Sequence, residues 1–425
     1  MSSMNFMEKL LNGVEVEWKA LWQVTTWDKR FNAVDNYKQP RVINYPYLLA
    51  ADLFKLEKDD GDIFLLSTGE RTGWTTEVLA GTYLRTGEVV TIPWGKSRPV
   101  KDVLKYYKGR FVTADNRIAT SSDTEKLLNK FLYYWLMSQS IVIDGFYRGS
   151  GIQHPSMAAV LDMQIPIPTL EIQAEIVRIL DTFAELTAEL TAELTARKKQ
   201  YNYYRDQLLS FPCSSVGMQG AVEWKTLGRI GEVRMCKRIL KSQTSSEGEI
   251  PFYKIGTFGK EPDAYIPRSL FEEYKSKYSY PKIGEILISA SGTIGRTVVF
   301  DGEDSYFQDS NIVWIENDES VVLNKFLFYF YKIANWGISE GGTIQRLYND
   351  NLRKLLIPVP YPNDPEKSIA EQARIVAILN KFEALTHTLS EGLPREIELR
   401  QKQYAYYRDL LLSFPKPAPD VAAVE

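Results

Sequence analysis

The chain has 425 residues and a formal net charge of -3, a length that allows two or three domains with their own hydrophobic cores. Its longest apolar runs fall well short of the roughly 20 residues that cross a bilayer, and its first residues lack the apolar stretch of a signal peptide. Two cysteines and two histidines cannot form a zinc site of usual spacing. We therefore expect a cytoplasmic protein without a metal site. The charge argues against a protein that coats nucleic acid, but it allows a local basic face.

In chain order, the sequence predicts two mixed α and β domains, each followed by a long helical segment. The expected segments are a helical stub (1–13), a first domain (14–164), a helical spacer (165–212), a second domain (213–356), a second helical spacer (357–415) and a flexible tail (416–425). The fold class is therefore α+β. The stub is expected because Glu8-Lys-Leu-Leu-Asn-Gly13 resembles the end of the first spacer.

The two spacers carry the same apolar pattern. Its positions alternate by three and four residues, which is the pattern of a narrow seam that packs on another helix. They are Ile176, Ile179, Phe183, Leu186 and Leu190, and then Ile375, Ile378, Phe382, Leu385 and Leu389. Both spacers end on nearly the same words, from Gln200 to Pro212 and from Gln403 to Pro415. Two unrelated amphipathic helices would not share so long a string.

An internal repeat extends through the domains as well. Four landmarks recur in the same order: Val16–Lys19 as Val222–Lys225, Gly87–Gly95 as Gly284–Gly292, Leu128–Trp135 as Leu323–Phe330, and Gly151-Ile-Gln-His154 as Thr343-Ile-Gln-Arg346. Between these landmarks the two domains differ strongly. The pattern indicates a shared frame that presents different residues.

Within the second domain, residues 286–289 and 297–300 are expected to form a hairpin around the glycines of residues 291–295. Residues 311–315 read as a buried strand and residues 323–331 as a helix. The Ile-Pro-Ile-Pro run ending at Pro168 and the Ile-Pro-Val-Pro run ending at Pro360 are expected to stop any strand, because proline cannot donate to a sheet.

Connectivity predicts how the helical spacers pair. The second spacer starts from the second domain, so it must run antiparallel to the first to bury its seam. We expect two related domains at opposite ends of an antiparallel coiled coil, with a pseudo-two-fold internal repeat and neighbouring termini. Gly392-Leu-Pro394 should interrupt the second spacer, because proline removes a helical hydrogen bond.

The whole chain resembles the specificity subunit of type I restriction–modification systems. The resemblance lies in three runs and their second copies: Ile165–Pro168, Gln173–Asp181 and Arg197–Phe211, then Glu371–Leu379, Glu391–Gln403 and the closing Tyr-Tyr-Arg-Asp. The tandem Thr-Ala-Glu-Leu units at Thr187 and Thr191 are similar to the repeats of the type IC branch. The resemblance implies a non-catalytic subunit whose two target recognition domains each read one half of a bipartite double-stranded DNA site.

The resemblance also implies partners. The helices would space the domains and dock two modification subunits, which methylate adenine with S-adenosylmethionine, while restriction subunits use ATP and Mg²⁺ to translocate and cut. This chain would bind none of these cofactors. Its own residues agree, because no nucleotide-binding glycine loop and no Asn/Asp-Pro-Pro-aromatic methyltransferase motif occurs in it. Glu17-Trp-Lys19 and Glu223-Trp-Lys225 match half of a nuclease motif, but a first strand with an anchoring tryptophan explains both.

Candidate DNA contacts come from basic clusters and from polar loops, since Lys and Arg neutralise phosphates whereas Arg, Gln and Asn suit base edges. The candidates are Lys96, Arg98, Lys101, Gln153 and His154 in the first domain, and Arg234, Lys237, Arg238, Ser291, Thr293, Arg296, Gln308, Asn311, Gln345 and Arg346 in the second. A solvated surface is the alternative for each charge. The loop that ends at Gln345 is the strongest candidate, because it recurs in both domains.

Candidate docking residues lie at the ends of the two spacers. They are Tyr203, Tyr204 and Arg205, and then Tyr406, Tyr407 and Arg408. The repetition favours equivalent docking faces for two partner copies over plain coiled-coil ends. The alternative for the whole protein is a coiled-coil interaction scaffold that does not bind DNA; salt-dependent, sequence-selective DNA binding by the complex would separate the two.

Overall fold

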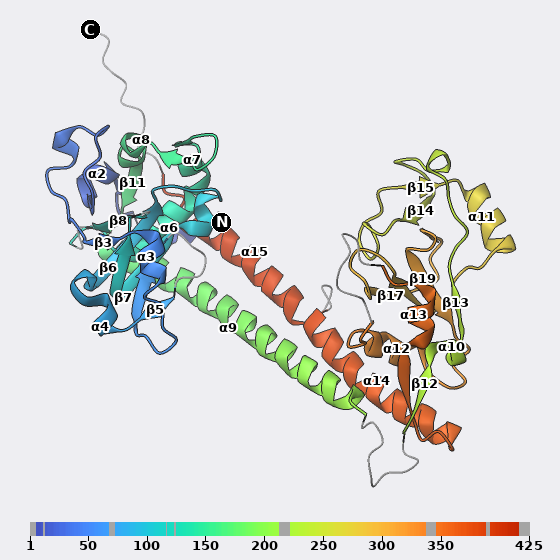
Figure 1. Cartoon of the computed structure of the whole chain (residues 1–425). Coiled ribbons are helices and arrows are strands. Elements are labelled where there is room, and N and C mark those ends of the chain that lie inside the picture. Colours follow the sequence, from blue (N-terminus) through green and yellow to red (C-terminus); the bar gives the residue numbers. More distant parts are fainter. Residues whose placement is uncertain are drawn as a thin grey trace. The chain divides into compact units, whose positions relative to one another are not determined.

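The computed structural model describes residues 6–11, 13–67, 73–115, 117–122, 125–211, 222–336, 346–387 and 392–415. The chain divides into two compact units. The first joins residues 1–190 to residues 397–425, and the second holds residues 191–396. Each unit therefore contains one α+β domain together with part of each helical spacer (Figure 1).

The first domain is built on one mixed sheet. Over the described residues, seven strands join in the order β2-β8-β6-β7-β4-β5, with β3 beside β7. Their bounds are β2 Thr25–Trp27, β3 Tyr47–Leu48, β4 Ile63–Leu66, β5 Trp74–Thr75, β6 Arg85–Pro93, β7 Lys105–Ala114 and β8 Arg117–Ser122. The short pairs are β1 Glu17–Ala20 with β11 Gln164–Ile167, and β9 Tyr147–Arg148 with β10 His154–Pro155.

The helices of the first domain are short, and the aromatic-rich α6 packs against the sheet. Its Phe131, Leu132 and Trp135 are buried in a core that also takes residues from β6 and from both spacers. The helices are α1 Phe6–Leu11, α2 Leu21–Val24, α3 Ala50–Phe54, α4 Glu77–Ala80, α5 Val100–Val103, α6 Asn129–Ser138, α7 Ser140–Asp144 and α8 Met157–Leu161, with 3₁₀ turns at Asn36–Lys38 and Gly81–Tyr83.

Over the described residues, the second domain contains the two-stranded sheet β12-β20 and two larger sheets. Among the described residues one has the order β13-β19-β16-β17 and the other the order β15-β14-β18. The bounds are β12 Val222–Thr226, β13 Glu232–Arg234, β14 Ile250–Tyr253, β15 Tyr265–Ile266, β16 Ile286–Ser289, β17 Thr297–Val299, β18 Tyr306–Phe307, β19 Ile312–Glu316 and β20 Leu356–Pro360. The helices are α10 Leu227–Ile230, α11 Arg268–Lys277, α12 Asn324–Tyr331 and α13 Asn349–Lys354, with a 3₁₀ turn at Lys241–Gln243.

The local predictions for the second domain are confirmed. Strands β16 and β17 form an antiparallel hairpin, β19 is buried beside β16, and α12 is buried along most of its length. The four-stranded sheet contributes to two cores, since alternate residues of a strand point to opposite faces. Ile286 and Ile288 of β16 pack in one core with α12, and Leu287 packs in the other.

The expectation that the proline runs stop any strand is wrong. Strand β11 pairs antiparallel with β1, placing Pro166 opposite Trp18. Strand β20 pairs with β12 in the same way, placing Pro358 opposite Trp224. Each sheet has two strands, so a proline in it sits on an edge strand, where its missing N–H need not remove a ladder bond. The proline runs are therefore strands of the two domains and not linkers that follow them.

The first unit shows how the spacers pair at the first domain. Helix α9 (Leu170–Leu209) begins there, and α15 (Leu393–Leu411) ends there, so the two run antiparallel. Ile176 and Leu180 are buried with Leu411 in one core. The rings of Phe183 and Tyr407 stack with centroids 5.1 Å apart. Leu11 of α1 belongs to the same core as Leu412, so the N-terminal stub and the end of the second spacer contribute to one core.

The second unit repeats the arrangement with the other helix ends. Helix α9 ends at the second domain and α14 (Pro365–His387) begins there, so these two are antiparallel as well. Tyr201 and Leu209 share a core with Ile375 and Leu379. The second spacer is interrupted as predicted, because α14 ends at His387 and α15 starts at Leu393.

A buried glutamine at the start of each spacer joins helix to domain. The Gln173 side chain accepts a hydrogen bond from the Leu128 N–H at 2.9 Å and donates to the Lys126 carbonyl at 2.8 Å. The Gln372 side chain accepts from the Leu323 N–H at 2.9 Å and donates to the Val321 carbonyl at 3.0 Å. Both side chains are fully buried, and each satisfies backbone groups at the start of α6 or α12, where a helix leaves N–H groups free.

About two turns further along each spacer, a buried tyrosine bonds to an acidic or amide side chain. The Tyr134 hydroxyl donates to Asp181, which also pairs with Lys130 at 2.9 Å. The Tyr329 hydroxyl donates to Glu383 at 2.7 Å and also lies 2.6 Å from the side-chain oxygen of Asn380. Burial pushes the pKa of Glu383 upward, but hydrogen bonds from Lys332 and Tyr329 hold it below its usual value. The carboxylate therefore stays ionised and holds α12 on α14.

Candidate nucleic-acid interface

Several of the predicted base-reading residues of the second domain meet at one end of its four-stranded sheet. We define the second-domain turn cluster as Ser291, Thr293, Arg296, Gln308, Asn311 and Arg346. The Ser291 hydroxyl donates to the Asn311 side-chain oxygen at 2.9 Å, and the backbones of Ser291 and Arg346 form an isolated bridge. The Arg346 guanidinium donates to the Ser310 hydroxyl at 3.0 Å. Residues far apart in the sequence are thus brought together by the ends of β16 and β19.

The hairpin turn of this cluster depends on glycine. Gly292 and Gly295 have φ values of +67° and +79°, a region that other residues rarely adopt. A Cβ at Gly295 would lie 2.3 Å from Nε1 of Trp336. The Ser289 hydroxyl closes the turn by donating to the Thr293 carbonyl and accepting from the Arg296 N–H. The turn therefore has a defined shape, with the Thr293 side chain exposed.

Two members of the cluster, Gln308 and Arg296, use their side chains in hydrogen bonds to the backbone of neighbouring loops. The Gln308 side chain accepts from the Ile255 N–H at 2.9 Å, and the Arg296 guanidinium donates to the Phe258 carbonyl at 3.0 Å. Arg346 is exposed, and its guanidinium has five N–H donors, one of which bonds to Ser310 within the described part of the chain. We therefore regard Arg346 as the member best placed to reach a base edge.

The first domain brings together the corresponding two segments with different side chains. By the repeat, Trp94 stands where the second domain has Ser291, and His154 stands where it has Arg346. His154 Nδ1 lies 2.9 Å from the Trp94 carbonyl, and the rings are 5.8 Å apart. Both side chains are exposed, Trp94 by 40%. Trp94 and His154 thus stand in the first domain where the second domain has the buried Ser291 and the exposed Arg346.

Trp94 was missed as a candidate in the sequence, although it lies at the end of a repeated landmark opposite Ser291. Its position in the repeat could have identified Trp94, because a residue that follows a repeated strand and precedes a repeated glycine must lie at the end of a sheet. Composition gave no such signal, since a tryptophan in an apolar run reads as core.

Lys96 has a structural role in the first domain. Its side chain is 7% exposed and its ammonium pairs with Asp144 at 2.7 Å. Its backbone bonds to Gln153 in both directions, and Nζ donates to the Gln153 side chain at 3.2 Å. A buried, paired ammonium has little positive charge to offer a phosphate, and the Gln153 side chain is engaged by the same ammonium. Arg98 and Lys101 lie on the exposed surface beside them.

The basic residues of the second domain divide in the same way. Arg234 lies between Glu232 and Glu316, at 2.8 Å from each, and the hydrogen bond to Glu316 raises the pKa of its guanidinium. Lys237 and Arg238 are exposed, with the Lys237 ammonium 5.1 Å from the Tyr278 ring centre. Gln345 and the glycine loop before it lie outside the described residues, so their candidacy stays a prediction.

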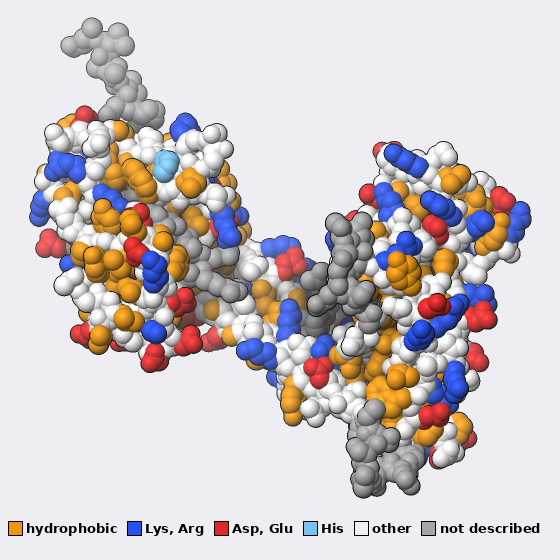
Figure 2. All heavy atoms as spheres, viewed as in Figure 1, with side chains coloured by type: hydrophobic (Ala, Val, Ile, Leu, Met, Phe, Trp, Pro, Cys, Tyr) orange, Lys and Arg blue, Asp and Glu red, His pale blue; other side chains and the backbone are white. Residues whose placement is uncertain are grey.

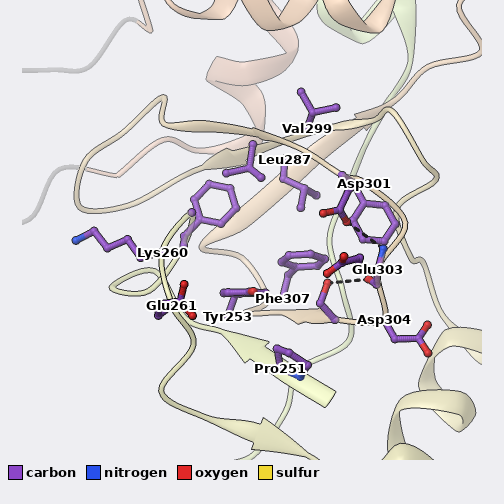
Figure 3. Close-up of a pocket in the computed structure, with 15 residues that line it drawn as sticks. Pro251, Tyr253, Lys260, Glu261, Leu287, Val299, Asp301, Glu303, Asp304 and Phe307 are labelled. Atoms are coloured by element: carbon purple, nitrogen blue, oxygen red, sulfur yellow. Dashed lines mark hydrogen bonds between the residues drawn. The ribbon is translucent and has the colours of Figure 1, made fainter. Parts of the chain in front are cut away.

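A separate pocket of about 330 Å³ in the second domain has the wrong charge for DNA (Figure 3). Tyr253, Phe258 and Phe307 line it together with the carboxylates of Glu261, Asp301 and Glu303. Burial, then Glu261, Asp301 and Glu303, raise the pKa of Tyr253. Carboxylates repel phosphate oxygens. This side of the second domain is therefore a poor candidate for the surface that contacts DNA.

The predicted docking residues occupy three different environments. Tyr204 stacks on Phe382 at 5.5 Å, as Tyr407 stacks on Phe183, so this pair belongs to the helix seams. Arg205 and Arg408 pair with the adjacent Asp206 and Asp409, each at 2.7 Å. Tyr203 and Tyr406 are 61% and 64% exposed. These two remain the members that a partner could cover.

The helix seams also contain Tyr201 and Tyr404, which are equivalent to each other in the repeat. Burial raises the pKa of each to about 12. Both hydroxyls therefore stay neutral at any physiological pH, and the antiparallel pairing does not depend on their ionisation. Within the described residues no group of His, Cys, Asp and Glu could hold a metal ion. Among those same residues, no helix is both long and apolar enough to cross a membrane.

The fold and the site define a duplicated protein in which one frame, repeated, presents different side chains at equivalent positions. The chain matches the family described as Type I restriction modification DNA specificity domain over residues 50–197 and 221–399. It belongs to that family, and the fold expected from the resemblance is confirmed.

Relatives cover nearly the whole chain. It is 49% identical to a type I restriction enzyme specificity subunit of Haemophilus influenzae, over 96% of this chain and 98% of that protein. It is 37% identical to the EcoR124I/EcoR124II specificity subunit of Escherichia coli, over 98% of this chain and 99% of that protein. A crystal structure of the type I restriction-modification S subunit from M. genitalium shares the fold, with a TM-score of 0.59 and 16% sequence identity. The match covers 96% of this chain and 98% of that one.

Proposed function

We propose that this chain is the DNA sequence-specificity subunit of a type I restriction–modification complex, and that each domain reads one half of a bipartite site. The proposal rests on one observation: equivalent positions of the repeated structure hold different side chains in the two domains. Trp94 and His154 in the first domain meet as Ser291 and Arg346 do in the second. A repeated frame with different side chains suits two unlike half-sites, because base edges are told apart by donors, acceptors and methyl groups.

The chain acts in this proposal without a catalytic site. Two modification subunits carry S-adenosylmethionine and methylate adenine, and restriction subunits supply ATP-driven translocation and cleavage with Mg²⁺. The chain itself binds none of these cofactors. The tandem Thr-Ala-Glu-Leu units at Thr187 and Thr191 support a type IC-like system in which the helices set the spacer. The runner-up, a scaffold that does not bind DNA, is not favoured by the family membership.

The purified chain alone is expected neither to methylate nor to cut DNA. The reason is that it has neither a nucleotide-binding loop nor an amino-methyltransferase motif. Transfer of the labelled methyl group of S-adenosylmethionine to DNA measures this, with the chain alone beside the chain plus its modification subunit. Adenine methylation by the solitary chain would overturn the proposed non-catalytic role.

Replacing Arg346 by Ala is expected to relax one position of the second half-site. A bidentate arginine contact to a base contributes about 1–3 kcal/mol, so methylation of the parental sequence by the complex should fall about 5-fold to 150-fold. Sequences changed at that one position should lose far less. Methylation rates on a set of single-base variants measure the effect.

The matched control is Arg353→Ala, which removes an arginine of α13 whose side chain is 53% exposed and bonds to Asp350. This variant should keep the parental motif and rate. If Arg346→Ala weakens binding uniformly on all sequences, with a smaller salt slope, then Arg346 contacts a phosphate and the base-reading assignment is wrong.

A further inference from the structure

Each domain has an open apolar groove, and the two grooves lie at equivalent places in the repeat. The first groove has a volume of about 620 Å³ and is lined by Trp18, Trp135, Gln139, Val142, Met163, Gln164, Leu412, Ser413 and Phe414. The second has a volume of about 560 Å³ and is lined by Trp224, Phe330, Ile333, Ala334, Asn335, Trp336, Asn351, Lys354, Leu355 and Leu356. Each lies within its own unit, between the two-stranded sheet and helix α6 or α12.

The repeat relates four lining residues of the first groove to four of the second. Trp18 corresponds to Trp224 in the repeated Val-Glu-Trp-Lys, and Trp135 corresponds to Phe330 at the end of the repeated helix. Met163 and Gln164 correspond to Leu355 and Leu356, immediately before the repeated Ile-Pro. In both domains, aromatic side chains from the two-stranded sheet and the helix thus lie beside an apolar side chain, Met163 or Leu355.

Packing alone does not explain why these walls stay apolar. Val142 and Leu356 are each 48% exposed, so neither side chain is needed to fill a core. Figure 2 shows hydrophobic side chains reaching the surface beside α12 and β12. Contiguous exposed apolar surface on a water-soluble domain is typical of a protein interaction site. The recurrence indicates one kind of occupant that binds in two copies.

The charge of the grooves identifies the occupant as protein and not DNA. Among the described lining residues, the first groove has no lysine, arginine or acidic side chain, and the second has Lys354 alone. A DNA backbone needs cationic neighbours. Side-chain amides stand on both rims, Gln139 and Gln164 in one and Asn335 and Asn351 in the other. They suit the backbone of a polypeptide that inserts an apolar side chain.

We propose that these two grooves are docking sites for the two copies of the modification subunit, each groove taking an apolar side chain of one copy. The proposal rests on the proposed function for the identity of the partner. The first groove continues from the end of α15, where Leu412 and Phe414 follow the exposed Tyr406 by a few residues. Leu412 and Phe414 lie just beyond the last residue of α15, Leu411, so the first groove adjoins the terminus of the helix that carries Tyr406.

The test counts partner copies. Val142→Glu places a charge in the first groove and Leu356→Glu places one in the second. Each single variant, mixed with the purified modification subunit, is expected to bind one copy where the unchanged chain binds two, as measured by native mass spectrometry. The apparent affinity for the lost copy should fall at least about tenfold. The double variant should bind neither copy.

The controls place the same charge on exposed apolar residues outside the grooves. Val78→Glu in the first domain and Ile283→Glu in the second change side chains that are 90% and 76% exposed, and both variants should bind two copies. Each single groove variant also carries its own control for folding, because its unchanged half must still hold one copy.

Three results would overturn the proposal. They are retention of two copies by both single groove variants, loss of both copies from one single variant, and a change in self-association of this chain with partner binding intact. The proposed function is judged separately, by whether the unchanged complex methylates a bipartite sequence. Site-specific methylation together with unaffected groove variants would leave that function standing and remove the docking sites.

Discussion

Exchanging the first domain for that of another family member is expected to change one half of the methylated sequence and leave the other half unchanged. The physical reason is that each domain closes its own cores within its own unit. Among the described residues, the second domain's two cores are built from that domain's own residues and from the spacer ends that pack on it. A new first domain therefore leaves the geometry of Ser291, Asn311 and Arg346 intact.

The structure also corrects where the exchange should be made. A junction after residue 164 would separate β1 from β11, since Lys19 pairs with Ile165 and Glu17 with Ile167. Exchanging residues 14–168 moves both strands together. The retained spacer residues Ile172 and Ile176 must still pack on the incoming domain. The measurement is the methylated motif, mapped by sequencing modified adenines. A change in both halves would show that the domains do not read independently.

Deleting Thr191 to Leu194 is expected to keep both half-sites and shorten the non-specific spacer between them by one base pair. Helix α9 is continuous through this segment, so removing four residues shortens it by about 6 Å and turns its far end by about 40°. The seam is maintained, because Leu190 then takes the place of the half-buried Leu194. DNA rises about 3.4 Å per base pair and turns about 35°. The rotation matches one pair, while the translation would allow nearly two.

Rotation should decide the outcome, because a domain on the wrong side of the duplex cannot reach its groove, whereas bending absorbs a small axial misfit. The methylated motif of the deletion variant, compared with its parent, measures the spacer. Inserting one more Thr-Ala-Glu-Leu unit is the matched control and should lengthen the spacer by one pair. An unchanged spacer in an active deletion variant would show that the helix does not set the distance.

Much of the architecture could be predicted from the sequence because it depends on local pattern. The three-four spacing around Ile176 and Phe183 specifies a helical seam wherever it occurs. The repeated landmarks specify two copies of one frame, and the break at Gly392 and Pro394 follows from the geometry of proline. The sequence also determined the family, since its motifs occur in order over nearly the whole length.

Other features were decided by tertiary structure, because they depend on which neighbours a residue meets. Lys96 reads as a phosphate contact until Asp144 arrives from a distant helix and neutralises it. Tyr204 reads from the sequence as a docking residue alone, whereas in the structure its ring also stacks on Phe382 while the side chain stays 41% exposed. Pro166 is tolerated in a strand only because that strand pairs on one side. The meeting of Ser291 with Arg346 and the two matched grooves follow from strand and helix ends converging in space, which no local pattern in the sequence encodes.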